Sequence, residues 1–199
     1  MKELFEQVRS EGKRLNQHTP EWVMYLKYVK CYFNEKGITN PLVVEIGILD
    51  GAQRIFYERL MGATYLGIDI DPKAPADIYG DSTSPSTLEA LKRRIDGRKI
   101  DLLFIDGLHT YNAVKSDYEK YYSLVSHIIG IHDILTPKLV PNDTVDVIRF
   151  WEELKVTNKT DTLITIQHFN PRPMNVFNGR PLGIGLVIKG ESYEDFGNF

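Results

Sequence analysis

Several short and almost purely apolar runs constrain the fold of this chain more than any other feature. Four of them read PLVVEIGI (residues 41–48), TYLGIDID (64–71), IDLLFID (100–106) and HIIGIHDI (127–134). Strands that are apolar on both faces are typical of a parallel sheet that helices cover on both sides. Because segments with helical spacing of apolar residues separate these runs, the sequence predicts an α/β fold.

Capping residues predict where the intervening helices begin. One helix is expected to start with Thr19 as its N-cap. Another is expected to start at Ser84 and Pro85, and the stretch from Ser86 to Glu89 matches a capping box. Further helices are expected after the glycine turn near residue 51, after residue 110 and after residue 144.

The C-terminal part of the chain follows a different pattern. DTLITIQHF (161–169) and PLGIGLVIKG (181–190) are two expected strands with no helical segment between them. Such a pair is expected to be antiparallel, because only parallel neighbours need a long crossover. The polar, turn-rich stretch at 169–181 that joins them is a candidate substrate-facing loop.

Composition narrows the class of protein. The 199 residues carry a net charge of −3, which gives no general attraction to nucleic acid or to anionic lipid. No apolar run is long enough to span a bilayer. The lone cysteine, Cys31, and the charged N-terminus predict a cytoplasmic protein. We expect one domain over 1–199, with an N-terminal helical extension at 1–38.

Polar residues follow the predicted strands at the edge where an open α/β sheet binds its ligands. In VVEIGILDGAQ, Glu45, Gly47 and Gly51 frame a turn from strand to helix. Glycines at such a turn let the backbone approach a ligand closely. The spacing differs from that of the dinucleotide-binding glycine motif, which disfavours a dehydrogenase.

The next two strands end in further candidate ligand contacts. Asp69 ends the second strand and could accept the two hydroxyls of a ribose, and Asp71 could play that part instead. Asp81 and Ser82 follow the short strand expected at ADIYG (76–80) and could reach an adenine amino group.

A third group of polar residues lies at the ends of the fourth and fifth strands. FIDGLHTY contains Asp106, His109 and Tyr111, and IHDI contains His132 and Asp133. If the two strands are neighbours, two carboxylates and two imidazoles converge on one small space, and Tyr111 is expected to face the same cleft.

The order of these sites resembles that in the Rossmann-like methyltransferases that use S-adenosylmethionine, and more narrowly in the branch with the methyltransferase 24 domain. The resemblance covers roughly Pro41 to Asp133. It implies a mostly parallel seven-stranded sheet with an antiparallel last strand and helices on both faces. It assigns the cofactor's methionine end to Glu45, Gly47 and Gly51, its ribose to Asp69, its adenine to Asp81 and Ser82, and the neighbourhood of its sulfonium to Asp106.

Two chemistries remain open for the cluster at the strand ends. Asp106, His132 and Asp133 could bind Mg²⁺ or Mn²⁺, and the cation would lower the pKa of a substrate hydroxyl. Without a metal, His109 or His132 could act as general base, with Asp106 beside it. Both routes lead to methyl transfer to oxygen.

The sequence therefore predicts an S-adenosylmethionine-dependent O-methyltransferase that acts on a small hydroxylated molecule, such as a sugar. A metal-dependent hydrolase or lyase on the same fold is one alternative, and a non-catalytic assembly subunit is another. We expect no nucleic-acid or membrane partner, and a homo-oligomer is compatible with the sequence.

Overall fold

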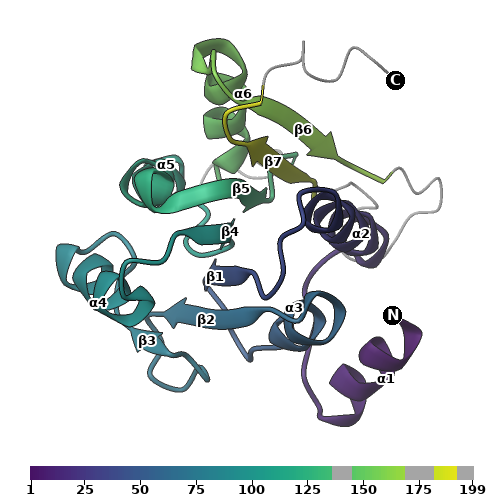
Figure 1. Cartoon of the computed structure of the whole chain (residues 1–199). Helices are drawn as coiled ribbons and strands as arrows, with labels where there is room; N and C mark the ends of the chain where they lie inside the picture. The colour runs from purple at the N-terminus through teal and green to yellow at the C-terminus, as the bar shows by residue number, and fades with distance from the viewer. Residues whose placement is uncertain (136–144, 169–181, 192–199) are drawn as a thin grey trace.

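A seven-stranded sheet forms the centre of the computed structural model, which describes residues 1–135, 145–168 and 182–191 (Figure 1). The strands are β1 Leu42–Ile46, β2 Thr64–Asp69, β3 Ile78–Tyr79, β4 Ile100–Ile105, β5 Val125–His132, β6 Thr162–Ile166 and β7 Ile184–Ile188. The order across the sheet is β3-β2-β1-β4-β5-β7-β6. Neighbours from β3 to β5 are parallel, and β7 is antiparallel to both β5 and β6. The predicted α/β sheet with an antiparallel last strand is confirmed.

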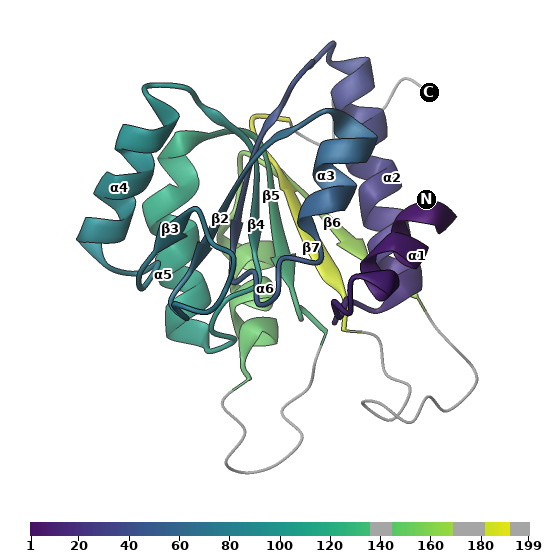
Figure 2. The ribbon, with the colours of Figure 1, turned by 90° about the horizontal axis from the view of Figure 1, so that it is seen from below.

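Helices cover both faces of the sheet (Figure 2). The helices are α1 Lys2–Ser10, α2 Thr19–Glu35, α3 Arg54–Met61, α4 Pro85–Ile95, α5 Tyr111–Tyr121, the short 3₁₀ helix η1 Tyr122–Leu124, and α6 Val147–Thr157. The first three lie on one face, and α4, α5 and α6 lie on the other. All five residues of β1 are buried, as expected for a strand with helices on both sides.

Two predicted helix starts need correction. Ser84 is the N-cap of α4, as expected, and its hydroxyl accepts a hydrogen bond from the backbone N–H of Thr87 at 3.2 Å. The predicted capping box from Ser86 to Glu89 is wrong, because Pro85 already occupies the first helical position. The N-cap of α2 is His18 rather than Thr19, and it makes no side-chain capping bond among the described residues.

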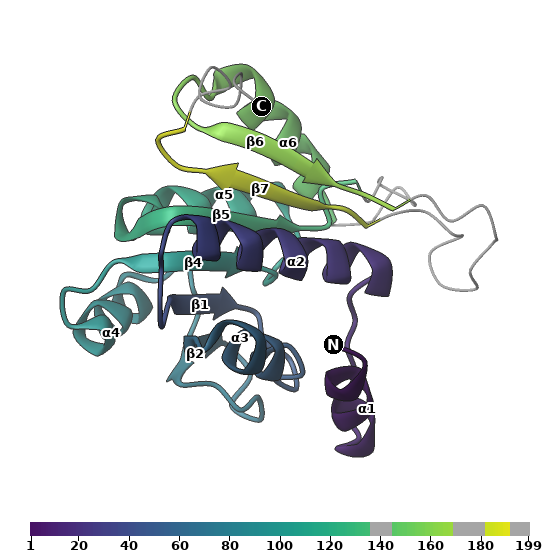
Figure 3. The ribbon, with the colours of Figure 1, turned by 45° about the vertical axis from the view of Figure 1, so that its right-hand side comes forward.

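The N-terminal segment forms part of the main core. Trp22, Tyr25 and Leu26 of α2 are fully buried, and the Trp22 ring lies 5.7 Å from that of Phe104 on β4. In Figure 3, α2 crosses the sheet with its N-terminal end on the side toward which β1 and β4 point. This orientation brings residues 14–19 to the carboxyl edge of the sheet. None of the described helices is both long and apolar enough to cross a membrane.

Candidate active site

A cavity of about 1160 Å³ opens at the carboxyl ends of β1, β2, β4 and β5. β1 and β4 are adjacent, although β2 and β3 follow β1 in the chain and lie on its other side. This reversal of chain order is where open α/β sheets bind ligands. The cavity is lined by residues from the turn after β1, the ends of β2 to β5, and the segment before α2.

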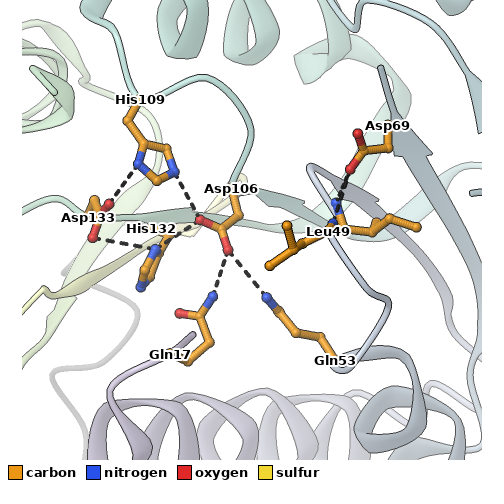
Figure 4. Close-up of polar contacts among 9 residues, drawn as sticks. Gln17, Leu49, Gln53, Asp69, Asp106, His109, His132 and Asp133 are labelled. Atoms are coloured by element: carbon orange, nitrogen blue, oxygen red, sulfur yellow. Dashed lines mark hydrogen bonds and ion pairs between the residues drawn. The ribbon is translucent and has the colours of Figure 1, made fainter. Parts of the chain in front are cut away.

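The turn after β1 forms one wall of the cavity. Gly47 has a φ of 81°, and its N–H donates to the carbonyl of Ile68 at 2.9 Å. The carboxylate of Asp69 accepts hydrogen bonds from the N–H groups of Ile48 at 2.9 Å and Leu49 at 3.1 Å (Figure 4). Asp69 therefore lines the cavity and also fixes the turn, and its contact with a ribose stays a prediction. Asp71 is not among the lining residues.

The loop after β3 forms a second wall, which α5 supports from behind. Asp81 and Ser82 both line the cavity. Asp81 accepts hydrogen bonds from the N–H and the hydroxyl of Thr83, and these bonds lower its pKa. The hydroxyl of Tyr121 on α5 donates to the carbonyl of Ser82 at 3.0 Å. The loop is thus held in place without a ligand.

Asp117 on α5 is a buried carboxylate behind this loop. Burial raises its pKa, and a hydrogen bond with Ser82 offsets burial only in part, so that the pKa of Asp117 is about 6. One of its oxygens has no hydrogen-bond partner within the described part of the chain. Sequence reasoning did not single out Asp117.

We expect the substitution Asp117→Asn to stabilise the protein at pH 8. A folded-state pKa near 6 lies above the ordinary value of 3.8, so the ionised carboxylate opposes folding above pH 6 and the penalty disappears as the pH falls. From these values the variant should gain about 3 kcal/mol at pH 8 and about 1.5 kcal/mol at pH 5. Urea unfolding at both pH values measures the difference. A gain that is the same at both would contradict the assignment.

The polar cluster predicted at the ends of β4 and β5 is present in the structure (Figure 4). His109 lies between two carboxylates: its Nε2 is 3.3 Å from Oδ1 of Asp106, and its Nδ1 is 2.9 Å from Oδ2 of Asp133. Nδ1 of His132 is 2.9 Å from the same Oδ1 of Asp106. All four residues line the cavity. Asp133 has a φ of 62°, a strained value for a residue other than glycine.

These contacts shift the pKa of each partner. Burial alone would raise the pKa of Asp106, but the two imidazoles outweigh burial and lower it. Burial alone would lower the pKa of His109, but Asp106 and Asp133 raise it to about 10. The pKa of His132 is also raised, because Asp106 outweighs burial. In the absence of another cation, the imidazole of His109 therefore carries a proton on both ring nitrogens at neutral pH.

Two glutamines that sequence reasoning missed complete the surroundings of Asp106. Nε2 of Gln17 donates to Oδ2 of Asp106 at 2.6 Å, and Nε2 of Gln53 donates to the same oxygen at 3.3 Å. Gln17 belongs to the segment between α1 and α2, 89 positions before Asp106. No local pattern marks such a residue. Gln53 could have been considered, because it directly follows the glycine turn.

Besides Asp71, three residues singled out from the sequence do not line the cavity. Glu45 is fully buried behind it and accepts a hydrogen bond from Tyr65 at 2.5 Å, and burial raises its pKa well above the ordinary range. Gly51 lies in the turn with its φ at 72°. Tyr111 points away from the cleft, contrary to our prediction, because its hydroxyl bonds to Glu153 on α6. The cofactor contacts predicted for Glu45 and Gly51 have no direct support in this geometry.

Residues 44–134 match the family model described as a methyltransferase domain. This part of the chain is similar to a methyltransferase domain. The matched part runs from β1 to the end of β5 and includes Asp69, Asp81, Asp106 and His132. No curated protein matches this chain.

Solved structures share the fold of the methyltransferase domain at low sequence identity. The chain aligns with TomG, an O-methyltransferase from Streptomyces achromogenes solved with S-adenosylmethionine, over 96% of its own length and 89% of TomG, with a TM-score of 0.60 and 14% identity. An O-methyltransferase from Bacillus cereus in complex with S-adenosylhomocysteine aligns over 94% and 90%, with a TM-score of 0.58 and 18% identity.

MycE, a methyltransferase of mycinamycin biosynthesis, is also similar. It was solved with Mg²⁺, S-adenosylhomocysteine and mycinamycin VI, and it aligns over 87% of this chain with a TM-score of 0.58 and 17% identity. The chain spans about half the length of MycE, because the alignment covers 50% of that protein. These likenesses establish the fold of the methyltransferase domain.

Proposed function

We propose that the protein is an S-adenosylmethionine-dependent methyltransferase that methylates a hydroxyl group of a small molecule. One observation carries the proposal: a single cavity connects the predicted cofactor wall, formed by Gly47, Asp69 and Asp81, with the polar cluster around Asp106 and His109. A methyl donor and its acceptor have to meet in one such space. The TomG and B. cereus structures support oxygen as the methylated atom.

The residues along the cavity suit the proposed cofactor. Its volume exceeds the usual range for a single small ligand, so that cofactor and acceptor can occupy it together. Leu49 and Ile70 line it and are 59% and 70% exposed, which leaves two large apolar side chains for a bound ligand to cover. Asp69, Asp81 and Ser82 also line the cavity, and we assign Asp69 to the ribose and the other two to the adenine.

The chain's own residues would then position the acceptor and control protons. S-adenosylmethionine, when bound, supplies a methyl group that its positive sulfur already activates. The cluster would orient the acceptor hydroxyl toward that methyl group. In the contacts described, His109 carries protons on both ring nitrogens and so does not accept one. The metal-free general-base role predicted for His109 therefore requires its ring to lose a proton first.

A divalent cation fits the cluster. One ligand atom each from Asp106, His109 and His132 lies within 4.8 Å of the other two. The set predicted from the sequence was Asp106, His132 and Asp133, with Mg²⁺ or Mn²⁺ as the metal. A cation bound here would supply positive charge that lowers the pKa of an acceptor hydroxyl.

Titration calorimetry with S-adenosylhomocysteine tests the proposed cofactor. We expect binding by the wild type and a 10- to 100-fold loss in Asp69→Ala, by analogy with the ~1.5–3 kcal/mol of a hydrogen bond to a charged group. Asp71→Ala is the matched control, because Asp71 is two positions away, is acidic and does not line the cavity. It should bind like the wild type.

Two results would contradict the proposal. No detectable binding by the folded wild-type protein would remove the cofactor, and the hydrolase or the assembly subunit would take its place. An equal loss of affinity in both variants would show that binding depends on negative charge near the cavity. It would not depend on a specific contact from Asp69. With binding established, transfer of a labelled methyl group to a panel of hydroxylated small molecules and sugars would identify the acceptor.

A further inference from the structure

We propose that the cluster is a binding site selective for a first-row transition metal, with Asp106, His109 and His132 as ligands and Asp133 as a positioning residue. The inference deepens the proposed function. Only the role of the metal in catalysis rests on that function. The binding itself can be measured without a methyl donor. The ligand set differs from the one predicted from the sequence, since His109 replaces Asp133.

The first argument is the arrangement of the three ligand atoms. Nε2 of His109 and Nδ1 of His132 lie 3.3 Å and 2.9 Å from the same oxygen, Oδ1 of Asp106. Two ligands in neighbouring positions around one ion lie roughly 3 Å apart when each metal bond is about 2.1 Å long. Two of the three separations therefore already suit a ligand set around one ion, and the two imidazole nitrogens lie within 4.8 Å of each other. His132 is 5% exposed, and its Nε2 has no hydrogen-bond partner in the part of the chain that is described.

The second argument is the set of contacts around the ligands. Nδ1 of His109 lies 2.9 Å from Oδ2 of Asp133, on the ring edge away from Nε2 (Figure 4). A histidine that binds a metal through one nitrogen usually donates the other N–H to a carboxylate or a carbonyl, which fixes the ring and strengthens the ligand. Asp133 occupies this position. It orients His109, and its strained backbone is consistent with a constrained role.

Asp106 is fixed in the same way. Its second oxygen, Oδ2, accepts hydrogen bonds from the amides of Gln17 and Gln53, which leaves Oδ1 facing the two imidazoles. Two of the three ligands are thus held by neighbours: His109 by Asp133, and Asp106 by Gln17 and Gln53. A preorganised site of this kind loses little conformational entropy when it binds an ion.

The third argument concerns the identity of the metal. Mg²⁺ prefers oxygen ligands and is rarely bound by imidazole, whereas imidazole suits Mn²⁺, Fe²⁺, Co²⁺ and Zn²⁺. Two of the three ligands here are imidazoles. The preference should therefore differ from that of an all-oxygen site. His109 is 33% exposed on the cavity side, so the ion would keep open positions toward an acceptor.

Titration of untagged, metal-stripped protein with Co²⁺, Zn²⁺ and Mg²⁺ tests the selectivity. An affinity tag of histidines has to be absent, because it binds the same metals. We expect one Co²⁺ per chain, with a visible absorption band that reports imidazole coordination, and binding at least ~100-fold tighter than that of Mg²⁺. Equal or tighter binding of Mg²⁺ would overturn the proposal.

Three variants test the ligand set. His109→Gln should abolish the Co²⁺ band, whereas Asp133→Asn should retain it and weaken binding by about 10- to 100-fold. The reverse order would overturn the assignment in favour of Asp133 as a ligand. His127→Gln is the matched control, since His127 lies at the opposite end of β5 and contacts Asp101, and it should bind Co²⁺ like the wild type.

The outcomes separate this inference from the proposed function. Binding of S-adenosylhomocysteine, measured on the same variants, reports both the cofactor site and correct folding. Loss of Co²⁺ selectivity with intact cofactor binding would overturn the metal assignment alone. Co²⁺ binding without any cofactor binding would overturn the proposed methyltransferase function and leave the metal site in place.

Discussion

Replacing Gly47 with alanine is expected to weaken the binding of S-adenosylhomocysteine by at least ~100-fold and to lower the free energy of unfolding by about 3 kcal/mol. An added Cβ would lie 2.3 Å from the carbonyl oxygen of Asp106 and 2.6 Å from Cα of Gly107. Both are backbone atoms at the end of β4, so no side chain can rotate to relieve the contact. The turn after β1 and the residues after β4 would have to separate.

That separation would disrupt the site on both sides. The turn carries the N–H groups that Asp69 holds, and the moved segment carries Asp106 itself. Gly47 also has a φ of 81°, which costs an alanine about 1–2 kcal/mol. Calorimetric titration measures the affinity, and urea unfolding measures the stability.

The variant Gly62→Ala distinguishes the effect of the steric contact at residue 47 from the effect of the left-handed backbone conformation. Gly62 ends α3 with a φ of 63°, and an added Cβ there would meet no described atom within 4 Å. Its cost should be about 1 kcal/mol, with unchanged affinity. If both variants lost the same stability and neither lost affinity, the close approach of Gly47 to Asp106 would have no role in ligand binding.

The second large effect is expected at Glu21, in the first turn of α2. Glu21 is 1% exposed, and its carboxylate accepts hydrogen bonds from the N–H groups of His168 at 3.0 Å and Gly183 at 3.1 Å. These residues follow β6 and precede β7, so one side chain joins α2 to the ends of two strands. Glu21→Ala should lower the free energy of unfolding by about 4 kcal/mol, because two N–H groups lose a charged acceptor.

Two further variants test this explanation by urea unfolding. Glu21→Gln keeps one acceptor oxygen and should lose about half as much stability as the alanine variant. Glu58→Ala removes a half-exposed glutamate from α3 and should cost about 0.5 kcal/mol. A loss below about 1 kcal/mol in Glu21→Ala would mean that water replaces the carboxylate, and that the strand ends do not depend on α2.

The order and type of the strands could be predicted because both depend on local patterns. Apolar runs such as that from Ile100 to Ile105 contain few polar residues, which suits only a strand covered on both faces. Ser84 and Pro85 together mark the start of α4. The prediction of a capping box at Ser86 was wrong because two helix-start signals overlap in this stretch. Pro85 occupies the first helical position, so the helix begins at Pro85 and its N-cap is Ser84. Helix α1 was covered only by the general expectation of a helical N-terminal extension.

The site was predicted in part, for a similar reason. Residues that end parallel strands lie at one edge of the sheet, so Asp69, Asp106 and His132 had to come near the cavity once the topology was correct. The prediction for Tyr111 was wrong because a position after a strand does not determine where the side chain points. Tyr111 is the first residue of α5, and its hydroxyl donates a hydrogen bond to Glu153 on α6. Glu45 failed to reach the cavity because alternate residues of a strand point to opposite faces.

The sequence by itself determined the parallel sheet and the residues along its carboxyl edge, because strand periodicity and helix capping act over a few neighbouring residues. Only the tertiary structure decided the partner of each polar group: Gln17 on Asp106, Asp133 on His109 and Glu21 on Gly183. Hydrogen bonds and ion pairs act over about 3 Å, and these partners come from segments whose distance in space depends on the packing of the whole fold. The residue types alone showed that the cluster at the ends of β4 and β5 would be polar. The proposed metal ligands and the residues that orient them rest on its arrangement in space.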